Sequence, residues 1–126
     1  MIDALFSDSN YVSAKKMLDV TLLRHEAIAS NLANIETPNY KRVDVSSSFE
    51  SQLQTAINSG DMKSVGSLTP QLAVDTSAVS GRADGNTVQL ENELLKMNEN
   101  TVANAAATEM LNESMARMRM AVTGKS

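Results

Sequence analysis

The side chains that most often carry catalysis or bind metals are scarce in this chain. It has no cysteine and a single histidine, His25, so thiol nucleophiles, disulfides and zinc thiolate sites are excluded. No second histidine and no carboxylate lie three or four residues from His25, where they would share its helix face. We expect His25 to be a packed or half-exposed structural residue. The many serines and threonines lack a base to activate them, so the sequence predicts no enzyme, metal or cofactor.

Two short motifs match parts of ligand-binding loops. Asp84, Gly85 and Glu91 match positions five, six and twelve of a calcium loop, but positions one and three are Ser80 and Arg82. The final residues, TGKS, match the end of a phosphate-binding loop, whose earlier glycine is replaced by arginine. No helix follows them to hold a phosphate. Neither motif predicts a site.

Composition favours one helical domain over residues 1–126. Of the 126 residues 42% are hydrophobic but only 3% are aromatic, which suits helices better than a β-sandwich. The net charge is −4 without any charged block, which argues against a basic nucleic-acid-binding face. No apolar run approaches the ~18 residues of a membrane helix, and no basic-then-apolar start predicts a classical cleaved signal.

An N-terminal helix is predicted over residues 8–36. No glycine or proline occurs between Tyr11 and Ile35, and Pro38 should end the helix near residues 34–36. Residues at the start, 7–10, are short and polar and can cap it. An apolar stripe with steps of three and four follows the helix: Tyr11, Ala14, Leu18, Leu22, His25, Ala29 and Leu32.

A longer C-terminal helix is predicted over residues 87–124. Glutamates lie in its first turn and basic residues at its end, the order that the helix dipole favours. Its stripe consists of Leu90, Leu94, Met97, Thr101, Asn104, Thr108, Leu111, Met115, Met118 and Val122. The polar members interrupt an apolar seam, beside which Val102, Ala106 and Met110 form a second row.

The middle, residues 37–86, is irregular and contains both prolines. Phe49, Leu53 and Ile57 predict a short helix over residues 48–59, with Ser47 and Glu50 as a capping box and Gly60 as its stop. Residues 65–80 alternate weakly and can form a small extended pair or β-hairpin. The predicted fold is therefore mainly α, with two long helices pairing in a coiled-coil-like layer.

Pairing the two stripes leaves apolar residues for other surfaces: Leu23, Ile28 and Ile35 on the first helix, and Leu95, Val102 and Met110 on the last. This surplus favours self-association or partner helices. Methionines 110, 115, 118 and 120 can serve either an adaptable binding surface or ordinary packing. The predicted assembly and packing residues are Leu18, Leu22, Ile28, Ala29, Leu32, Leu94, Met97, Leu111, Met115 and Met118.

The stretch HEAIASNLANIETPNYKR, residues 25–42, resembles the N-terminal signature of the flagellar basal-body rod, hook and hook-associated axial proteins. The matching residues are Asn31, Leu32, Ala33, Asn34, Thr37, Pro38 and Tyr40. We interpret this signature as a structural joint, in which Asn31 and Asn34 tie the helix end to the following chain and Pro38 forces the chain off the helical path.

Among these proteins the modest middle is most similar to that of a proximal rod subunit, since hook and distal rod proteins carry large inserted domains. The resemblance implies a structural part of the periplasmic rod, which transmits torque from the MS ring to the distal rod and hook and lines the export channel. It implies export by the flagellar type III apparatus without a cleavable signal. The implied partners are a FliE-type adaptor, the MS ring, other proximal and distal rod proteins, and further copies of the chain. Asn104 stands where such subunits commonly carry tyrosine, which predicts looser packing there.

A cytoplasmic helical adaptor or secretion chaperone is the alternative, because it would use the same amphipathic helices. Such a protein has no reason to carry the sequence NLANIETPNY. A small hydrolase or metal enzyme fits least, since it needs clustered carboxylates or histidines.

Overall fold

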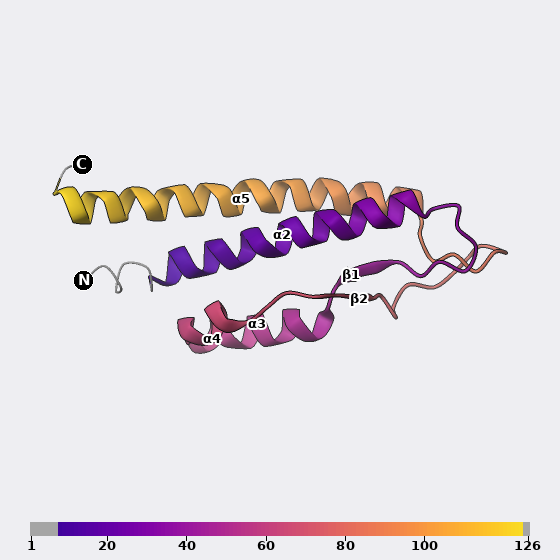
Figure 1. Cartoon of the computed structure of the whole chain (residues 1–126), viewed down its shortest axis with the longest axis horizontal. Coiled ribbons are helices and arrows are strands. Elements are labelled where there is room, and N and C mark those ends of the chain that lie inside the picture. Colours follow the sequence, from indigo (N-terminus) through magenta and orange to yellow (C-terminus); the bar gives the residue numbers. More distant parts are fainter. Residues whose placement is uncertain (1–7, 125–126) are drawn as a thin grey trace.

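Two long helices lie side by side and account for most of the length of the molecule (Figure 1). The computed structural model describes residues 8–124, in which helix α2 spans Ser9–Ala33 and helix α5 spans Leu90–Thr123. The helices are antiparallel, and the middle of the chain packs on the side of α2 away from α5. The mainly helical fold with paired terminal helices is confirmed.

The ends of the long helices follow the expected signals with small differences. Asp8 occupies the N-cap position of α2 but its side chain makes no capping hydrogen bond, and residue 7 lies outside the described residues. Asn34 occupies the C-cap position at the other end. The chain then turns through residues 34–39, which include Pro38. Helix α5 carries Glu91 and Glu93 in its first turn and ends at Gly124, which has a left-handed φ of 68°.

The middle contains a two-stranded antiparallel sheet and two short helices. Strand β1 (Val43–Val45) pairs with β2 (Leu72–Val74), with Asp44 opposite Ala73. The expected extended pair within residues 65–80 is wrong, because the start of that range belongs to helix α4 (Met62–Ser67) and its one strand pairs with β1. Asp61 caps α4 by accepting a hydrogen bond from the Ser64 amide at 3.2 Å, which favours a helical turn over a strand there.

Helix α3 (Ser47–Ser59) matches the predicted short helix. The predicted capping box is wrong by one residue, since the Ser46 hydroxyl accepts the hydrogen bond from the Phe49 amide. The Ser46 amide in turn donates to the carbonyl of Gln71, so the residue just before β2 holds this serine in the capping position. Gly60 ends the helix with a φ of 75°, as expected.

The apolar core lies between α2 and the middle segment. Val20, Val45 and Phe49 form its buried centre, and the half-buried leucines around it are Leu23, Leu53, Leu68 and Leu72. Leu23, expected to be left for other surfaces, packs against this core because α3 and β1 cover that side of α2. The core is small, as the low aromatic content predicts.

The contact between α2 and α5 includes Ala14 of the predicted stripe but otherwise uses neighbouring positions. Residues buried on α5 recur every seven positions and are mostly small or polar: Glu93, Asn100, Ala107 and Ser114. They face Ala14, Thr21 and Ile28, which are also seven residues apart on α2. Small side chains let the helices approach closely, and the Asn100 Nδ2 donates to the Thr21 carbonyl at 2.8 Å. This heptad spacing is that of a coiled-coil seam.

The predicted seam is therefore wrong in its rotation about the helix axes. Leu22 is 59% exposed, Leu94 41% and Met115 47%, whereas Ile28, expected to be free, is only 2% exposed. Sequence periodicity locates the apolar side chains, but close packing and hydrogen bonding select the smaller neighbouring stripe. His25, expected to be packed or half-exposed, is exposed on α2.

Candidate functional site

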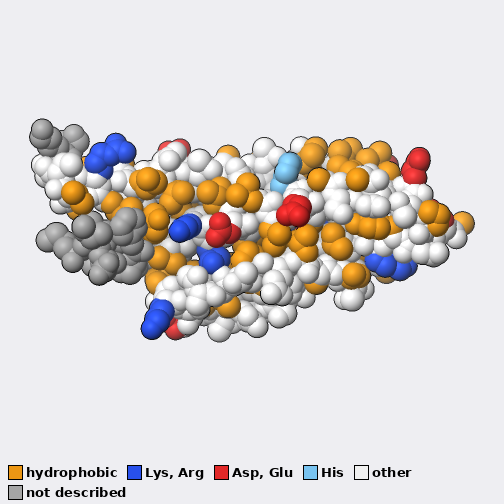
Figure 2. Space-filling model, in the orientation of Figure 1, with side chains coloured by type: hydrophobic (Ala, Val, Ile, Leu, Met, Phe, Trp, Pro, Cys, Tyr) orange, Lys and Arg blue, Asp and Glu red, His pale blue; other side chains and the backbone are white. Residues whose placement is uncertain are grey.

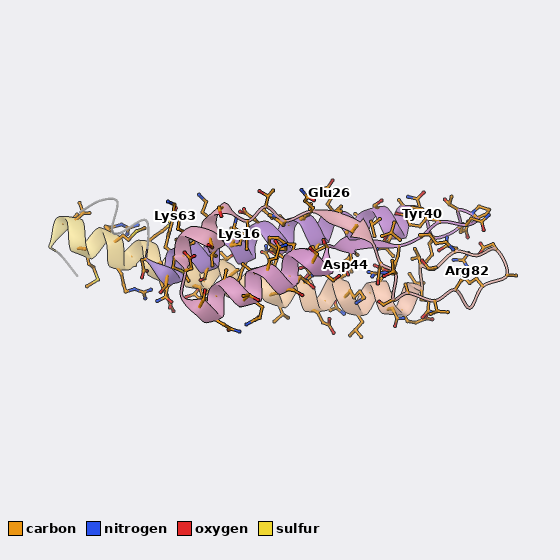
Figure 3. The ribbon with its side chains drawn as sticks, turned by 90° about the horizontal axis from the view of Figure 1, so that it is seen from below. Lys16, Glu26, Tyr40, Asp44, Lys63 and Arg82 are labelled. Atoms are coloured by element: carbon orange, nitrogen blue, oxygen red, sulfur yellow. The ribbon has the colours of Figure 1, made fainter. Side chains whose placement is uncertain are left out.

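The residues of the signature lie at one end of the molecule. There the end of α2 leads toward β1, and the loop between β2 and α5 leads into α5. Figure 3 places Tyr40 and Arg82 at this end, with Asp44 further back along the paired helices. Asn31 in α2, the turn over residues 34–40 and the segment 82–88 meet here. We call this region the joint.

Asn31 is the centre of the joint and is fully buried. Its amide pairs with the backbone of Val43 as a neighbouring strand would: the Nδ2 donates to the Val43 carbonyl at 2.8 Å and the Oδ1 accepts from the Val43 amide at 2.9 Å. The second N–H donates to Glu93 at 3.3 Å, and the Tyr40 hydroxyl donates to the Oδ1 at 3.4 Å. Every hydrogen-bonding position of this amide is occupied, so it ties α2, β1 and α5 together.

Asn86 binds the carbonyls of the turn that follows α2. Its Nδ2 lies 2.8 to 3.1 Å from three carbonyl oxygens, those of Asn34, Ile35 and Thr37. Its Oδ1 accepts from the Val88 amide at 2.7 Å, just before α5 begins. Backbone carbonyls in such a turn need partners because no regular helix or sheet supplies them. Asn86 therefore links the end of α2 to the start of α5.

A turn within the signature, at Asn39, meets a second turn at Gly85, and the two residues have positive φ angles of 62° and 77°. The Asn39 amide donates to the Asp84 carbonyl at 2.8 Å. A Cβ on residue 85 would lie 2.5 Å from the Asn39 Oδ1, so glycine permits this close approach of the two loops. The sequence ADGN is thus a turn, as expected, and it docks onto the signature.

A buried ionic network extends from the joint. The Arg42 Nε donates to Glu93 at 2.6 Å and its Nη1 donates to Asp75 at 2.5 Å. Arg42 and Glu93 are 4% and 0% exposed. Burial alone would lower the pKa of Arg42, but the hydrogen bonds with Glu93 and Asp75 outweigh it and raise that pKa. Arg42 therefore stays charged, fastening β1 to α5 and to the end of β2.

The network continues to α3 through Arg24. The Arg24 Nε donates to Asp44 at 3.0 Å, and its Nη2 donates to Glu50. Partial burial acts to lower the pKa of Arg24, and the hydrogen bonds with Glu50 and Asp44 overcome that effect and raise it. The pKa of Asp75 is lowered, first by the hydrogen bond from the Ser77 hydroxyl and then by Arg42, against the opposing effect of burial.

The structure brings together part of the predicted signature set. Asn31, Asn34, Thr37 and Tyr40 are linked by hydrogen bonds: the Asn34 Nδ2 donates to the Ser30 carbonyl at 2.9 Å, and the Thr37 hydroxyl donates to the Asn34 Oδ1 at 3.1 Å. Leu32 is half-buried, while Ala33 and Pro38 are exposed. The joint interpretation of Asn31 and Asn34 agrees with these contacts.

Sequence reasoning missed Asn86, Arg42 and Glu93. Their positions were the one sequence feature that could have pointed to them: Arg42 is the last residue of the signature stretch, Asn86 follows a turn, and Glu93 lies in the first turn of a helix. Position alone does not say which charges meet across 51 residues of sequence.

Of the predicted assembly residues, Ile28 is buried in the contact between α2 and α5, and the others are exposed or half-buried on the long helices. Leu22, Ala29, Leu94 and Met115 are exposed, while the half-buried members are Leu18, Leu32, Met97, Leu111 and Met118. Figure 2 shows hydrophobic side chains gathered in patches over the long helices. The most exposed large apolar side chains of α5 are Val102 (71%), Val122 (66%) and Leu95 (57%). Leu95 and Val102 were expected to remain free, and they are.

Within residues 8–124, no group of three or more histidine, aspartate and glutamate side chains is placed to hold a metal ion. None of the helices in this described part of the chain is both long and apolar enough to cross a membrane.

Several known proteins are similar to this chain over most of its length. Flagellar basal body rod protein FlgB of Borrelia hermsii is 32% identical over 105 residues, which cover 69% of this chain and 76% of that protein. FlgB of Aquifex aeolicus is 30% identical over 115 residues, covering 89% of this chain and 91% of that protein. A shorter stretch of 46 residues is 48% identical to FlgB of Borreliella burgdorferi. No protein-family model matches the chain.

The chain belongs to the FlgB family of flagellar basal body rod proteins. This membership confirms the resemblance that the signature indicated. In this FlgB family member the signature residues act inside the subunit, where they fix how α2, β1 and α5 meet. Large apolar side chains on α2 and α5, among them Leu22, Leu95 and Val102, stay exposed in the single subunit.

Proposed function

We propose that this chain is a structural, non-enzymatic subunit of the proximal rod of the flagellar basal body. In that role it transmits torque from the MS ring to the distal rod and hook, and its helices contribute to the wall of the export channel. One observation carries this proposal: α5 turns polar and small side chains inward to α2 and leaves large apolar side chains exposed along its length. Such a face has no use within the subunit and suits burial against neighbouring helices.

The neighbours that we propose are a FliE-type adaptor and the MS ring on one side, other proximal and distal rod proteins on the other, and further copies of this chain. We further propose that the chain reaches the periplasm through the flagellar type III export apparatus without a cleavable signal. The joint supports torque transmission, because a fully hydrogen-bonded amide and a buried ion pair resist rotation of α2 against α5.

A deletion of the gene, with basal bodies imaged and swimming measured in the native bacterium, tests this function. We expect cells with membrane rings but no rod or hook, restored by the unaltered gene. Swimming cells with complete basal bodies would contradict the proposal and favour the cytoplasmic adaptor or chaperone.

Two complementing variants sharpen the test. Leu94→Asp places a charge on an exposed α5 position, so the subunit should fold but fail to restore swimming. Leu32→Asp, at a half-buried position on α2, should also abolish assembly. Asn98→Asp, on an exposed polar position of α5, is the control that should restore swimming.

A further inference from the structure

The outer surface of α5 carries two short strips with the same layout and opposite charge. The acidic strip consists of Leu95, Glu99 and Val102, and the basic strip consists of Met115, Arg119 and Val122. In each strip the steps are four and three residues, which place an apolar, a charged and a second apolar side chain on one helix face. All six residues are exposed. Each strip is therefore available to a partner helix.

The strips face opposite sides of the helix. Equivalent positions, such as residues 99 and 119, are 20 residues apart in the sequence. At 3.6 residues per turn and 1.5 Å per residue, this offset corresponds to a rotation of about 200° and an axial separation of about 30 Å. One α5 helix therefore cannot bring its own two strips together, but it can offer one strip to each of two neighbours.

We propose that the basic strip of one copy packs against the acidic strip of the next copy, with the two α5 helices parallel. Met115 then faces Leu95, Arg119 faces Glu99 and Val122 faces Val102. This inference rests on the proposed function, in which all copies point the same way along the rod, and it identifies the contact between copies. Because the two surfaces differ and lie on opposite sides, the contact is heterologous and need not close after two copies.

Charge complementarity identifies the occupant of the acidic strip. No described residue forms an ion pair with Glu99, and the basic residue at the matching place in the other strip is Arg119. Apolar side chains flank both charges, so packing would partly shield the new ion pair from solvent. A helix without a cation at this place would match the shape but leave Glu99 unpaired.

The cleft beside Glu99 supplies a second argument. It measures about 350 Å³ and lies between α5, α2, β1 and α3, with the charged lining Arg24, Asp44, Glu50, Lys96 and Glu99. The three carboxylates of this lining outnumber its two cations. An arginine of the next copy that approaches Glu99 therefore meets a locally acidic surface, and its guanidinium has five N–H donors to offer.

Disulfide trapping tests the contact directly, because the chain contains no cysteine. The double variant Val102→Cys and Val122→Cys should form dimers and larger multimers upon mild oxidation of basal bodies from the complemented deletion strain. The two cysteines of one chain lie about 30 Å apart on the helix, well beyond disulfide reach, so every disulfide joins two copies. Each single variant should give none.

The matched control pairs Thr108→Cys with Val122→Cys. Both positions lie on the side of α5 that carries the basic strip, and we expect little disulfide between them. Complete rods without a disulfide in the Val102→Cys, Val122→Cys variant would overturn this contact and leave the proposed function standing. If the proposed function is wrong, the deletion strain will instead contain complete basal bodies.

Charge exchange provides an independent test. Glu99→Arg alone and Arg119→Glu alone should each lower the disulfide yield about tenfold, since an attraction becomes a repulsion. The two changes together should restore the yield to within about threefold of the parent. Glu113→Arg and Lys63→Glu, the same charge changes at other exposed positions, should have little effect. Swimming of the charge variants without cysteines is the second measurement, and a double variant no better than the worse single one would contradict the proposal.

Discussion

The guanidinium of Arg42 and the carboxylate of Glu93 form a buried ion pair, with an Nε to Oε1 distance of 2.6 Å. It joins β1 to the first turn of α5, and the same carboxylate accepts a hydrogen bond from Asn31 in α2. Three segments from distant parts of the chain therefore meet on one acidic side chain. Since a buried charge without partners is costly, each of the three groups depends on the other two.

Glu93→Gln should lower the free energy of unfolding by about 2–4 kcal/mol, because Arg42 loses its most buried counter-charge. Urea unfolding followed by circular dichroism measures the loss. Glu91→Gln, two residues earlier on an exposed position of α5, should change the stability by less than about 0.5 kcal/mol. Equal effects of the two substitutions would show that the pair does not hold the joint.

Asn31→Ala should destabilise the protein by about 2–3 kcal/mol and loosen β1 locally. The Val43 amide and carbonyl both lose their partner in this variant, and buried unpaired backbone groups are costly. Hydrogen exchange of the Val43 amide should accelerate more than that of the core residue Val20. Asn98→Ala, on an exposed α5 position, is the control. Unchanged exchange at Val43 would argue against the amide pairing.

Gly85→Ala should cost about 1–2 kcal/mol, because alanine is strained at a φ of 77°. The new Cβ would also displace the Asn39 side chain, whose Oδ1 lies 2.5 Å from it. Gly81→Ala is the matched control in the same loop, since its Cβ would meet no atom within 4 Å. Thermal unfolding compares the two, and a Gly81→Ala variant as unstable as Gly85→Ala would exclude this explanation.

Asp75 should contribute a pH-dependent part of the stability. Its pKa is lower in the folded chain than its ordinary value, owing first to the Ser77 hydroxyl and then to Arg42. The contribution is therefore complete above the ordinary pKa of about 4 and is lost as the pH falls through the lower folded value.

The substitution Asp75→Asn removes this group. Unfolding free energies of Asp75→Asn should fall less steeply with acid between about pH 5 and pH 3 than those of the parent chain. Asp19→Asn, at an exposed position on α2, serves as the comparison and should keep the steep dependence. Parallel pH curves for the parent and Asp75→Asn would contradict the assigned role.

Local sequence patterns were enough to predict both long helices, the short helix α3 and the family. Within each long helix, apolar residues recur in steps of three and four, and glycine and proline are absent from most of the helix. Pro38 and Gly60 mark helix ends. These are local signals, and periodicity reports local geometry. The NLANIETPNY signature identified a flagellar axial protein, because its polar residues occur in an order that an ordinary amphipathic helix does not need. The same reasoning identified Asn31 and Asn34 as parts of a joint, without naming what they contact.

Which stripes of the long helices meet depends on how the whole chain packs. The seam uses Ala14, Thr21 and Asn100 in place of the leucines, because the gain from close approach and paired amides cannot be read from hydrophobicity along one helix. Likewise β2 pairs with a strand 27 residues earlier, and Arg42 finds Glu93 across 51 residues, since long-range pairing depends on how the chain folds back. Leu95 and Val102 lie outside both the predicted stripe and the stripe that meets α2, so their exposure could be predicted although the seam could not.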